Sequence, residues 1–365
     1  MAARATLSIW KSEPLVDEAI EFNLFHARSG AGKIEVTEQA MQDLSQRLRA
    51  KRFDLAIDLR KQPDTRHVLP YSGARILVGF DHQGRFPWLD VALEWDEDVP
   101  LRTKHGHVAD DLIALVETLA THSGTDRSAV VTAPVGPLLL PEAQKRGLFS
   151  KPLICIHPAA GSAMRQWPLE KFSELIELLL DEEDFDLALI GGADEADIAV
   201  KVLDRVDRKA RVFNLMGKFS LADLPKLLVK SALFVGNNSG PQHLAAGLGI
   251  PTLGIHSGVV DAREWGPLGP NAVAVRRDMS CSPCFIEQPK DCPRGLACLT
   301  ELDVISVFNS CMQLLIQPTR LQPSGRSRPR WGAKAAVAST DNEANCKSNG
   351  LSAESKPASV SASQD

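Results

Sequence analysis

Short apolar runs rich in Val, Ile and Leu alternate along this chain with longer amphipathic stretches. This alternation is typical of parallel β-strands joined by crossover helices, and two successive series of it predict two doubly wound α/β domains. We expect strands at residues 7–10, 55–58, 76–78, 130–132, 153–157, 187–190, 233–235, 252–255 and 272–275, and helices at 36–48, 107–119, 169–180, 195–206, 221–230, 242–247 and 302–316. Prolines and glycines interrupt regular structure between residues 134 and 151, so we place an N-terminal domain at 1–145 and a C-terminal domain at 146–317.

The first expected strand lies almost at the start of the sequence. A doubly wound domain of this kind normally opens with a strand and a loop that carries a ligand group, yet no such unit precedes Leu7. We therefore expect the N-terminal domain to lack its first βα unit.

Composition changes sharply after residue 317. The segment 318–365 is rich in Pro, Ser, Arg, Ala and Asn, has one aromatic residue, Trp331, and shows no apolar period. Such a segment cannot bury enough surface to offset the entropy of ordering it, so we predict a disordered tail.

Charge and hydropathy exclude several classes of protein. The chain has 41 basic and 46 acidic side chains, and this net charge of -5 gives no long-range attraction to nucleic acid. No run approaches the roughly 18 apolar residues of a membrane span, and no apolar signal segment follows Met1. We expect a cytoplasmic protein that does not bind nucleic acid.

The loop after the expected strand at 153–157 is the first candidate for ligand binding. In open α/β sheets, ligands bind at the carboxyl ends of the strands. Gly161 lets backbone N–H groups approach an anion, Ser162 offers a hydroxyl and Arg165 can bind phosphate with its planar guanidinium. The alternative is an ordinary strand-to-helix turn with a surface arginine.

A second candidate loop follows the strand at 233–235. Asn238 and Ser239 stand where a helix N-cap is expected, and Gly240 follows them, which places free N–H groups at the positive end of a helix dipole. His243 lies about one turn into that helix, on a face able to meet the same anion. These residues suggest a diphosphate site, although a single histidine is more often structural.

Two carboxylates follow other expected strands. Glu195 comes after the glycine pair at 191–192 and could bind ribose hydroxyls, but a Gly-Gly turn is weak evidence. Asp58 ends the strand at 55–58, with Arg60 and Lys61 close behind it. It could contact a sugar or act as a base, and a structural salt link is an equal alternative.

Four of the seven cysteines lie close together in the sequence, at Cys281, Cys284, Cys292 and Cys298. One CxxC pair followed by two more cysteines can form a tetrahedral zinc site, although a second CxxC pair would be more specific. The alternatives are free or structural thiols, and disulfide or redox chemistry.

Two of these segments together carry a resemblance to a known family. The stretch from Asn238 through Ser239, Gly240 and Pro241 to His243 is similar to the (Asp or Asn)-(Ser or Thr)-Gly-x-x-His motif of glycosyltransferase family 9, the ADP-heptose:lipopolysaccharide heptosyltransferases. The second segment runs from His157-Pro158 through Gly161 to Arg165 and Trp167-Pro168, and it resembles the family's segment with Lys or Arg before Trp-Pro. The Cys-Ser-Pro-Cys stretch at 281–284 also resembles a variant of this family. The resemblance covers most of residues 50–316.

The resemblance implies a GT-B fold, in which two Rossmann-like domains hold a nucleotide sugar mainly through the C-terminal one. It implies an inverting transfer that needs no metal or other cofactor, with an ADP-sugar or another nucleotide sugar as donor and a lipopolysaccharide core or related glycan as acceptor. The cytoplasmic side of the inner membrane is then the expected location, with peripheral membrane contact. The donor residues carried over are Gly161, Ser162, Arg165, Glu195, Asn238, Ser239, Gly240 and His243.

The sequence departs from the family at the general base. The family places an Asp in a Gly-Asp segment after the first strand of the N-terminal domain, and no such segment precedes Leu7. Asp58 is the only replacement that we name. The alternatives are an impaired protein that binds a nucleotide sugar without efficient transfer, and a different GT-B enzyme such as a nucleotide-sugar epimerase.

Overall fold

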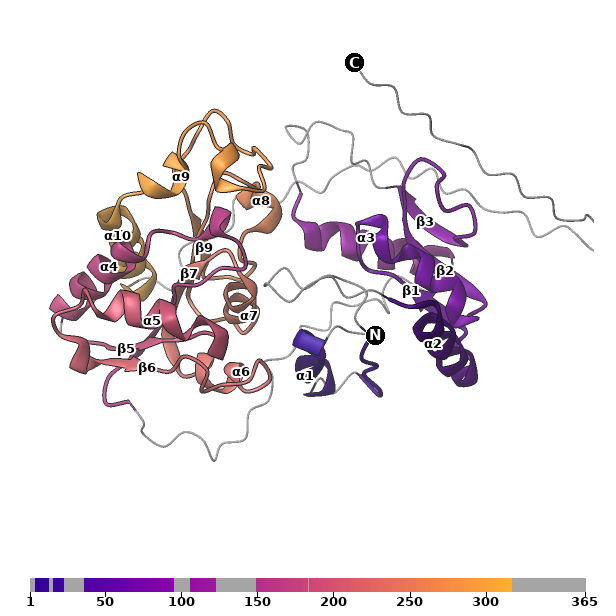
Figure 1. The fold of residues 1–365 in the computed structure, drawn as a ribbon, viewed down its shortest axis with the longest axis horizontal. Coiled ribbons are helices and arrows are strands. Elements are labelled where there is room, and N and C mark those ends of the chain that lie inside the picture. Colours follow the sequence, from indigo (N-terminus) through magenta and orange to yellow (C-terminus); the bar gives the residue numbers. More distant parts are fainter. Residues whose placement is uncertain are drawn as a thin grey trace, which may run out of the picture.

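The computed structural model describes residues 4–12, 16–22, 36–94, 106–122, 149–182 and 184–316, and these ranges form two α/β domains (Figure 1). The expected strand at 130–132, the expected domain boundary at 145 and the tail at 318–365 lie outside the described residues. None of the helices in the described ranges is both long and apolar enough to cross a membrane.

The N-terminal domain contains a small parallel sheet with the strand order β1-β2-β3 in its described part. Its elements are α1 (Arg4–Ser12), α2 (Glu38–Lys51), β1 (Leu55–Ile57), η1 (Pro63–Ser72), β2 (Ile76–Asp81), β3 (Val91–Glu94) and α3 (Val108–His122). The expected strands at 55–58 and 76–78 and the expected helices at 36–48 and 107–119 are thereby confirmed. The short strand β3 was not predicted.

The expected strand at 7–10 is wrong, because these residues belong to helix α1. A run of four residues is too short to distinguish the helical period from the strand period. In the helix the side chain of Leu7 is buried, whereas Trp10 is 47% exposed. The expectation of a missing first βα unit used that strand as its starting point and loses this support.

Helix α2 begins and ends where local chemistry requires. The Thr37 side chain accepts a hydrogen bond from Ala40 N at 3.2 Å and so caps a free amide of the first turn. Arg52 ends the helix in the left-handed conformation, with φ of 54°. The helix packs Leu44 and Leu48 into a small apolar cluster.

The C-terminal domain is built on a parallel sheet with the order β6-β5-β4-β7-β8-β9. Its strands are β4 (Leu153–His157), β5 (Asp186–Leu189), β6 (Val212–Asn214), β7 (Ser231–Asn237), β8 (Thr252–Ile255) and β9 (Ala272–Val275). Its helices are α4 (Leu169–Asp181), α5 (Ala196–Leu203), α6 (Leu224–Leu228), α7 (Gly240–Gly247), α8 (Ala262–Trp265), α9 (Ala297–Thr300) and α10 (Val304–Ile316), with one-turn segments η4 (Ala163–Arg165), η5 (Ala193–Glu195), η6 (Lys209–Arg211) and η7 (Pro289–Asp291). Every strand expected in this half is confirmed, and β6 is additional.

Helices cover both faces of this sheet. Ile154 and Ile156 of β4 point into a core with Phe172 and other residues of α4, α5 and α10. Leu153 and Cys155 point to the opposite face and pack with α6 and α7. All five residues of β4 are buried, as expected for a central parallel strand.

The strand order reverses between β4 and β7. From β4 the chain proceeds outward through β5 and β6, then returns to place β7 on the other side of β4. The loops that leave these two strands therefore diverge, and the crevice between them is where open α/β sheets bind ligands. These are the two candidate ligand-binding loops that were predicted after the strands at 153–157 and 233–235.

Candidate active site

A buried asparagine joins the loops that leave β4 and β7 at the switch point, the place where the strand order reverses. Asn237 is the last residue of β7 and has no exposed surface. Its Oδ1 accepts from Trp167 N at 3.0 Å, and its Nδ2 donates to Pro158 O at 2.8 Å and Ala159 O at 3.3 Å. The end of β7 thereby fixes both ends of the loop after β4, a role that the sequence analysis did not assign.

Arg165 connects the same two loops from the side of the crevice. Its Nη1 donates to Asn238 O at 3.3 Å, and a Cβ added at Gly161 would lie 3.4 Å from its Nη2. Ser162 caps the short turn η4 by accepting from Met164 N at 3.3 Å. The structure therefore brings Gly161, Ser162, Arg165 and Asn238 together, and their role in donor binding stays a prediction.

Helix α7 begins at this crevice. Ser239 is its N-cap residue, and its Oγ donates to Asn237 O at 3.0 Å. Gly240 is exposed, and a Cβ there would meet nothing within 4 Å, so the first turn of the helix is open to a ligand. Amide groups of a first helical turn favour anions.

His157 links Ser239 to Glu195. Its side chain is buried, with Nδ1 3.1 Å from Ser239 Oγ and Nε2 3.4 Å from Glu195 Oε2. Burial alone would raise the pKa of Glu195, but His157 and the Gly192 N–H, which donates at 2.8 Å, lower it overall. Glu195 is therefore a carboxylate at neutral pH, held at the carboxyl end of β5. From the sequence, His157 is predicted only as the last residue of a strand and the start of the following loop.

His243 is half-buried in α7. Burial lowers its pKa, and the nearby His107 and Arg165 lower it further. The imidazole is therefore neutral at pH 7, next to a cationic guanidinium. His107 comes from the N-terminal domain, so both domains contribute side chains close to this point.

A second histidine lies behind His243. His256 follows β8 and is fully buried, with Nε2 3.1 Å from Gln242 Oε1. Burial, followed by His243 and two arginines, lowers the pKa of His256 to about 3. Gly254 makes room for this pair, because a Cβ there would lie 2.2 Å from Gln242 Oε1. Neither His256 nor Gln242 was predicted.

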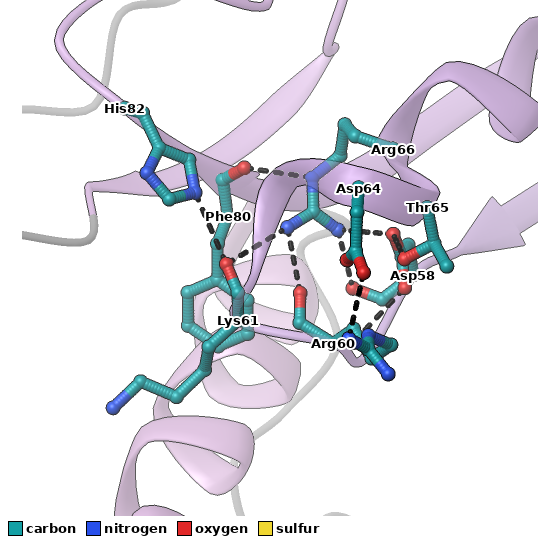
Figure 2. Close-up of polar contacts among 8 residues, drawn as sticks. All are labelled: Asp58, Arg60, Lys61, Asp64, Thr65, Arg66, Phe80 and His82. Atoms are coloured by element: carbon teal, nitrogen blue, oxygen red, sulfur yellow. Dashed lines mark hydrogen bonds and ion pairs between the residues drawn. The ribbon is translucent and has the colours of Figure 1, made fainter. Parts of the chain in front are cut away.

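Asp58 forms a salt link inside the N-terminal domain (Figure 2). Its Oδ2 lies 2.6 Å from Nη1 of the fully buried Arg66 and accepts from Thr65 Oγ1 at 2.8 Å. Its Oδ1 accepts from Arg60 N at 2.9 Å. Both carboxylate oxygens are thus engaged, which favours the structural alternative over the role of base.

The four clustered cysteines are free thiols in the described structure. Burial raises the pKa of Cys298, and Cys284, Cys292 and Cys281 raise it further. Among the described residues, however, no three or more His, Cys, Asp or Glu side chains are gathered in a group able to hold a metal ion. The geometry gives the structural-zinc hypothesis no support.

Comparison with known proteins gives a consistent result. The family model described as "Glycosyltransferase family 9 (heptosyltransferase)" matches residues 41–292. Lipopolysaccharide heptosyltransferase 3 of Escherichia coli is 23% identical over 266 residues, which cover 71% of this chain and 76% of that protein. Lipopolysaccharide heptosyltransferase 2 of E. coli K12 is 28% identical over 260 residues, covering 67% and 69%.

Solved structures show the same fold. E. coli ADP-heptose lps heptosyltransferase II superposes with a TM-score of 0.64 at 23% identity, covering 87% of this chain and 89% of that one. The E. coli heptosyltransferase WaaC with ADP-2-deoxy-2-fluoro heptose gives a TM-score of 0.58 at 19% identity, covering 87% and 88%. The expected GT-B architecture of two Rossmann-like domains is confirmed.

Proposed function

Because the chain belongs to glycosyltransferase family 9, we propose that it moves a heptose-like sugar from a nucleoside-diphosphate donor to a lipopolysaccharide core or related glycan. The observation that carries this proposal is the meeting of Arg165, Asn238 and the open first turn of α7 at the switch point. Two of the compared relatives are lipopolysaccharide heptosyltransferases, which supports the acceptor class. One solved neighbour holds an ADP-heptose analogue, which supports an adenine nucleotide.

In this mechanism the protein stabilises the leaving diphosphate. Negative charge grows on the diphosphate as the glycosidic bond breaks, and preorganised donors lower the free energy of that transition state. Arg165 supplies a fixed cation, while the Ser162 hydroxyl, the Asn238 side chain and the backbone N–H groups of Ser239 and Gly240 supply hydrogen-bond donors. This set performs the task that a metal ion performs in other transferases, so we infer metal-independent transfer.

The remaining contacts to the nucleotide-sugar donor are inferred from where their side chains lie. Glu195 is an ionised carboxylate at the next strand end and is suited to accept hydrogen bonds from ribose hydroxyls. His243 lies one turn into α7, where its neutral imidazole can donate to a sugar or phosphate oxygen. Gly161 keeps the loop after β4 free of side-chain bulk beside Arg165.

Inversion requires the acceptor hydroxyl to attack from the face opposite the diphosphate, where a base from the N-terminal domain takes its proton. Asp58 is the side chain that sequence analysis names for this task. Its ion pair with Arg66 favours a second candidate function, in which the chain binds a nucleotide sugar without efficient transfer. We place either function at the cytoplasmic side of the membrane that carries the glycolipid acceptor.

Calorimetric titration with ADP, GDP and UDP tests the donor site. We expect ADP to bind, and Arg165→Ala and His243→Ala each to weaken it at least about tenfold, as loss of a charge-assisted hydrogen bond does. Arg205→Ala is the matched control, since Arg205 is an exposed cation paired with Glu170 on the outer surface. Equal ADP affinity in all variants would contradict the assignment.

A transfer assay with ADP-heptose and a lipopolysaccharide-core acceptor separates the two candidate functions. Product formation, with the anomeric configuration read by NMR, supports an inverting transferase. Tight ADP-sugar binding with no product on core acceptors supports the binding protein.

A further inference from the structure

Two side chains of the N-terminal domain reach helix α8 of the C-terminal domain. His107 Nε2 lies 3.0 Å from Gly266 O, and Lys61 Nζ lies 3.9 Å from Glu264 Oε1. Glu264 belongs to α8, and Gly266 follows that helix directly. Figure 1 shows α8 on the side of its domain that faces the N-terminal domain. These two pairs are called the interdomain contact below.

The orientation of His107 is fixed within its own domain. Ala109 N donates to His107 Nδ1 at 3.0 Å, and His107 N donates to Asp110 Oδ2 at 3.1 Å, at the start of α3. An imidazole whose Nδ1 accepts a hydrogen bond carries its proton on Nε2. His107 therefore presents an N–H donor to Gly266 O across the domain boundary.

The scaffold drawn in Figure 2 holds the backbone of Lys61. His82 Nε2 lies 3.0 Å from Lys61 O, and Arg66 Nη2 donates to the preceding carbonyl, Arg60 O, at 2.6 Å. The Lys61 side chain is only 7% exposed and pairs with Asp111 of α3 as well as with Glu264. Both N-terminal side chains of the interdomain contact are thus held by groups of their own domain.

His107 also lies beside the proposed donor site. Burial lowers the pKa of His243, and the charges of His107 and Arg165 add to this lowering. The partner of His107 also lies in the segment after β8, the strand that pairs with β7. Gly266 directly follows α8, which itself comes after the loop leaving β8. Asp261 caps α8, and its Oδ1 lies 3.7 Å from Nη1 of Arg276, the residue after β9. The His107 imidazole therefore touches the segment after β8, next to the strand β7 at whose carboxyl end the proposed anion site lies.

We propose that His107 is a positioning residue of the donor site, through which diphosphate binding in the C-terminal domain is linked to closure of the N-terminal domain on α8. This inference rests on the proposed function, because it requires a nucleoside diphosphate at Arg165 and His243. The contact holds the N-terminal domain where it can present an acceptor to the bound sugar. A nucleoside diphosphate whose binding draws the two domains together then gains affinity from the interdomain contact. It loses that gain when the His107 Nε2–H group is removed.

Calorimetry of the full chain with ADP tests the link. His107→Ala removes the donor to Gly266 O, and we expect the Kd for ADP to rise about five- to tenfold, as for one hydrogen bond. His107→Gln places an amide Nε2 near the position of the imidazole Nε2, so we expect affinity close to that of the wild type. Lys61→Met should raise the Kd a few-fold. His67→Gln, an exposed histidine of the same domain, is the matched control.

Small-angle scattering gives a second measurement that a purely local effect would not change. We expect ADP to reduce the radius of gyration of the wild type and of His107→Gln, and to reduce that of His107→Ala less. Rescue by glutamine distinguishes a positioning role from simple loss of packing. If His107→Ala does not fold, Lys61→Met carries the test, because an unchanged Kd and an unchanged compaction in that variant would overturn the inference.

Two kinds of failure can be told apart. If wild-type protein binds ADP and His107→Ala binds it equally tightly with equal compaction, the inference is overturned while the proposed function stands. If the wild type binds no nucleoside diphosphate, the proposed function fails and this inference fails with it.

Discussion

Trp167 N donates to Asn237 Oδ1 across 70 positions of sequence, at a distance of 3.0 Å. This single bond joins Trp167, two residues before α4, to the last residue of β7, and so connects the two loops on either side of the switch point. The Trp167 indole extends the connection, because its Nε1 donates to Leu302 O at 3.2 Å ahead of α10. The proposed anion site is therefore held by buried groups beneath its surface.

Replacing Asn237 should weaken both stability and binding. Asn237→Ala removes three hydrogen bonds and leaves the amide of Trp167 and the carbonyls of Pro158 and Ala159 buried without that partner. We expect a loss of about 2–4 kcal/mol in the free energy of unfolding, measured by urea denaturation, together with weaker ADP binding. Asn309→Ala, on the exposed side of α10, is the control and should change stability by no more than about 0.5 kcal/mol. An unchanged midpoint for Asn237→Ala would refute this structural role.

Asp58→Asn separates the two interpretations of that carboxylate. Arg66 has no exposed surface, so removing the charge of Asp58 leaves a buried cation without its ion-pair partner. We expect a loss of about 3–5 kcal/mol in unfolding free energy, as for other broken buried pairs. Asp64→Asn is the control, because Asp64 forms a half-exposed pair with Arg60 and should have little effect. A variant that kept full stability but lost kcat would instead identify Asp58 as the base.

The two domains differ in how much of their fold the sequence predicts. Buried parallel strands are continuous apolar runs, which is why β4 and β8 are found at their observed bounds. The edge strand β6 has only one buried residue, Val212, so its sequence shows no such run. The segment at 7–10 is misassigned because an isolated apolar run of four residues fits either period.

The site shows the same division. Gly161, Arg165 and His243 are predictable because they follow strand ends in a loop or first helical turn, a relationship local in sequence. Their supporting groups are not predictable in this way. His157 contacts Ser239, which is 82 positions away in the sequence, and His107 contacts Gly266, which is 159 positions away. Only the folded chain brings these pairs together.

Two glycines of the same region should respond in opposite ways to alanine. At Gly254 a Cβ would lie 2.2 Å from Gln242 Oε1 and 3.0 Å from His256 Nε2, both on buried side chains. We expect Gly254→Ala to cost about 1–3 kcal/mol through overpacking. Gly247 ends α7 with open space around a Cβ, so Gly247→Ala should be neutral or stabilise by up to about 1 kcal/mol. Equal effects in urea denaturation would show that the Gln242–His256 pair does not depend on Gly254.

The buried His256 should make stability depend on pH. Its pKa is lowered to about 3 in the folded protein, first by burial and then by His243, Arg276 and Arg165. In the unfolded chain a histidine titrates near 6.5. Below that pH the unfolded state takes up a proton that the folded state does not, so stability falls as pH decreases. Above it, both states are neutral and His256 adds no pH dependence.

A single residue of this kind contributes about 1.4 kcal/mol between pH 7.5 and pH 5.5. In urea denaturation, we expect the unfolding free energy of the wild type to fall by about 1.4 kcal/mol more over this pH interval than that of His256→Gln. In this variant Gln242 still has a neutral polar neighbour. Because the variant keeps His243 and every carboxylate, the difference between the two proteins isolates His256. If both lose the same stability on acidification, His256 is protonated in the folded state and the buried, neutral pair with Gln242 is wrong.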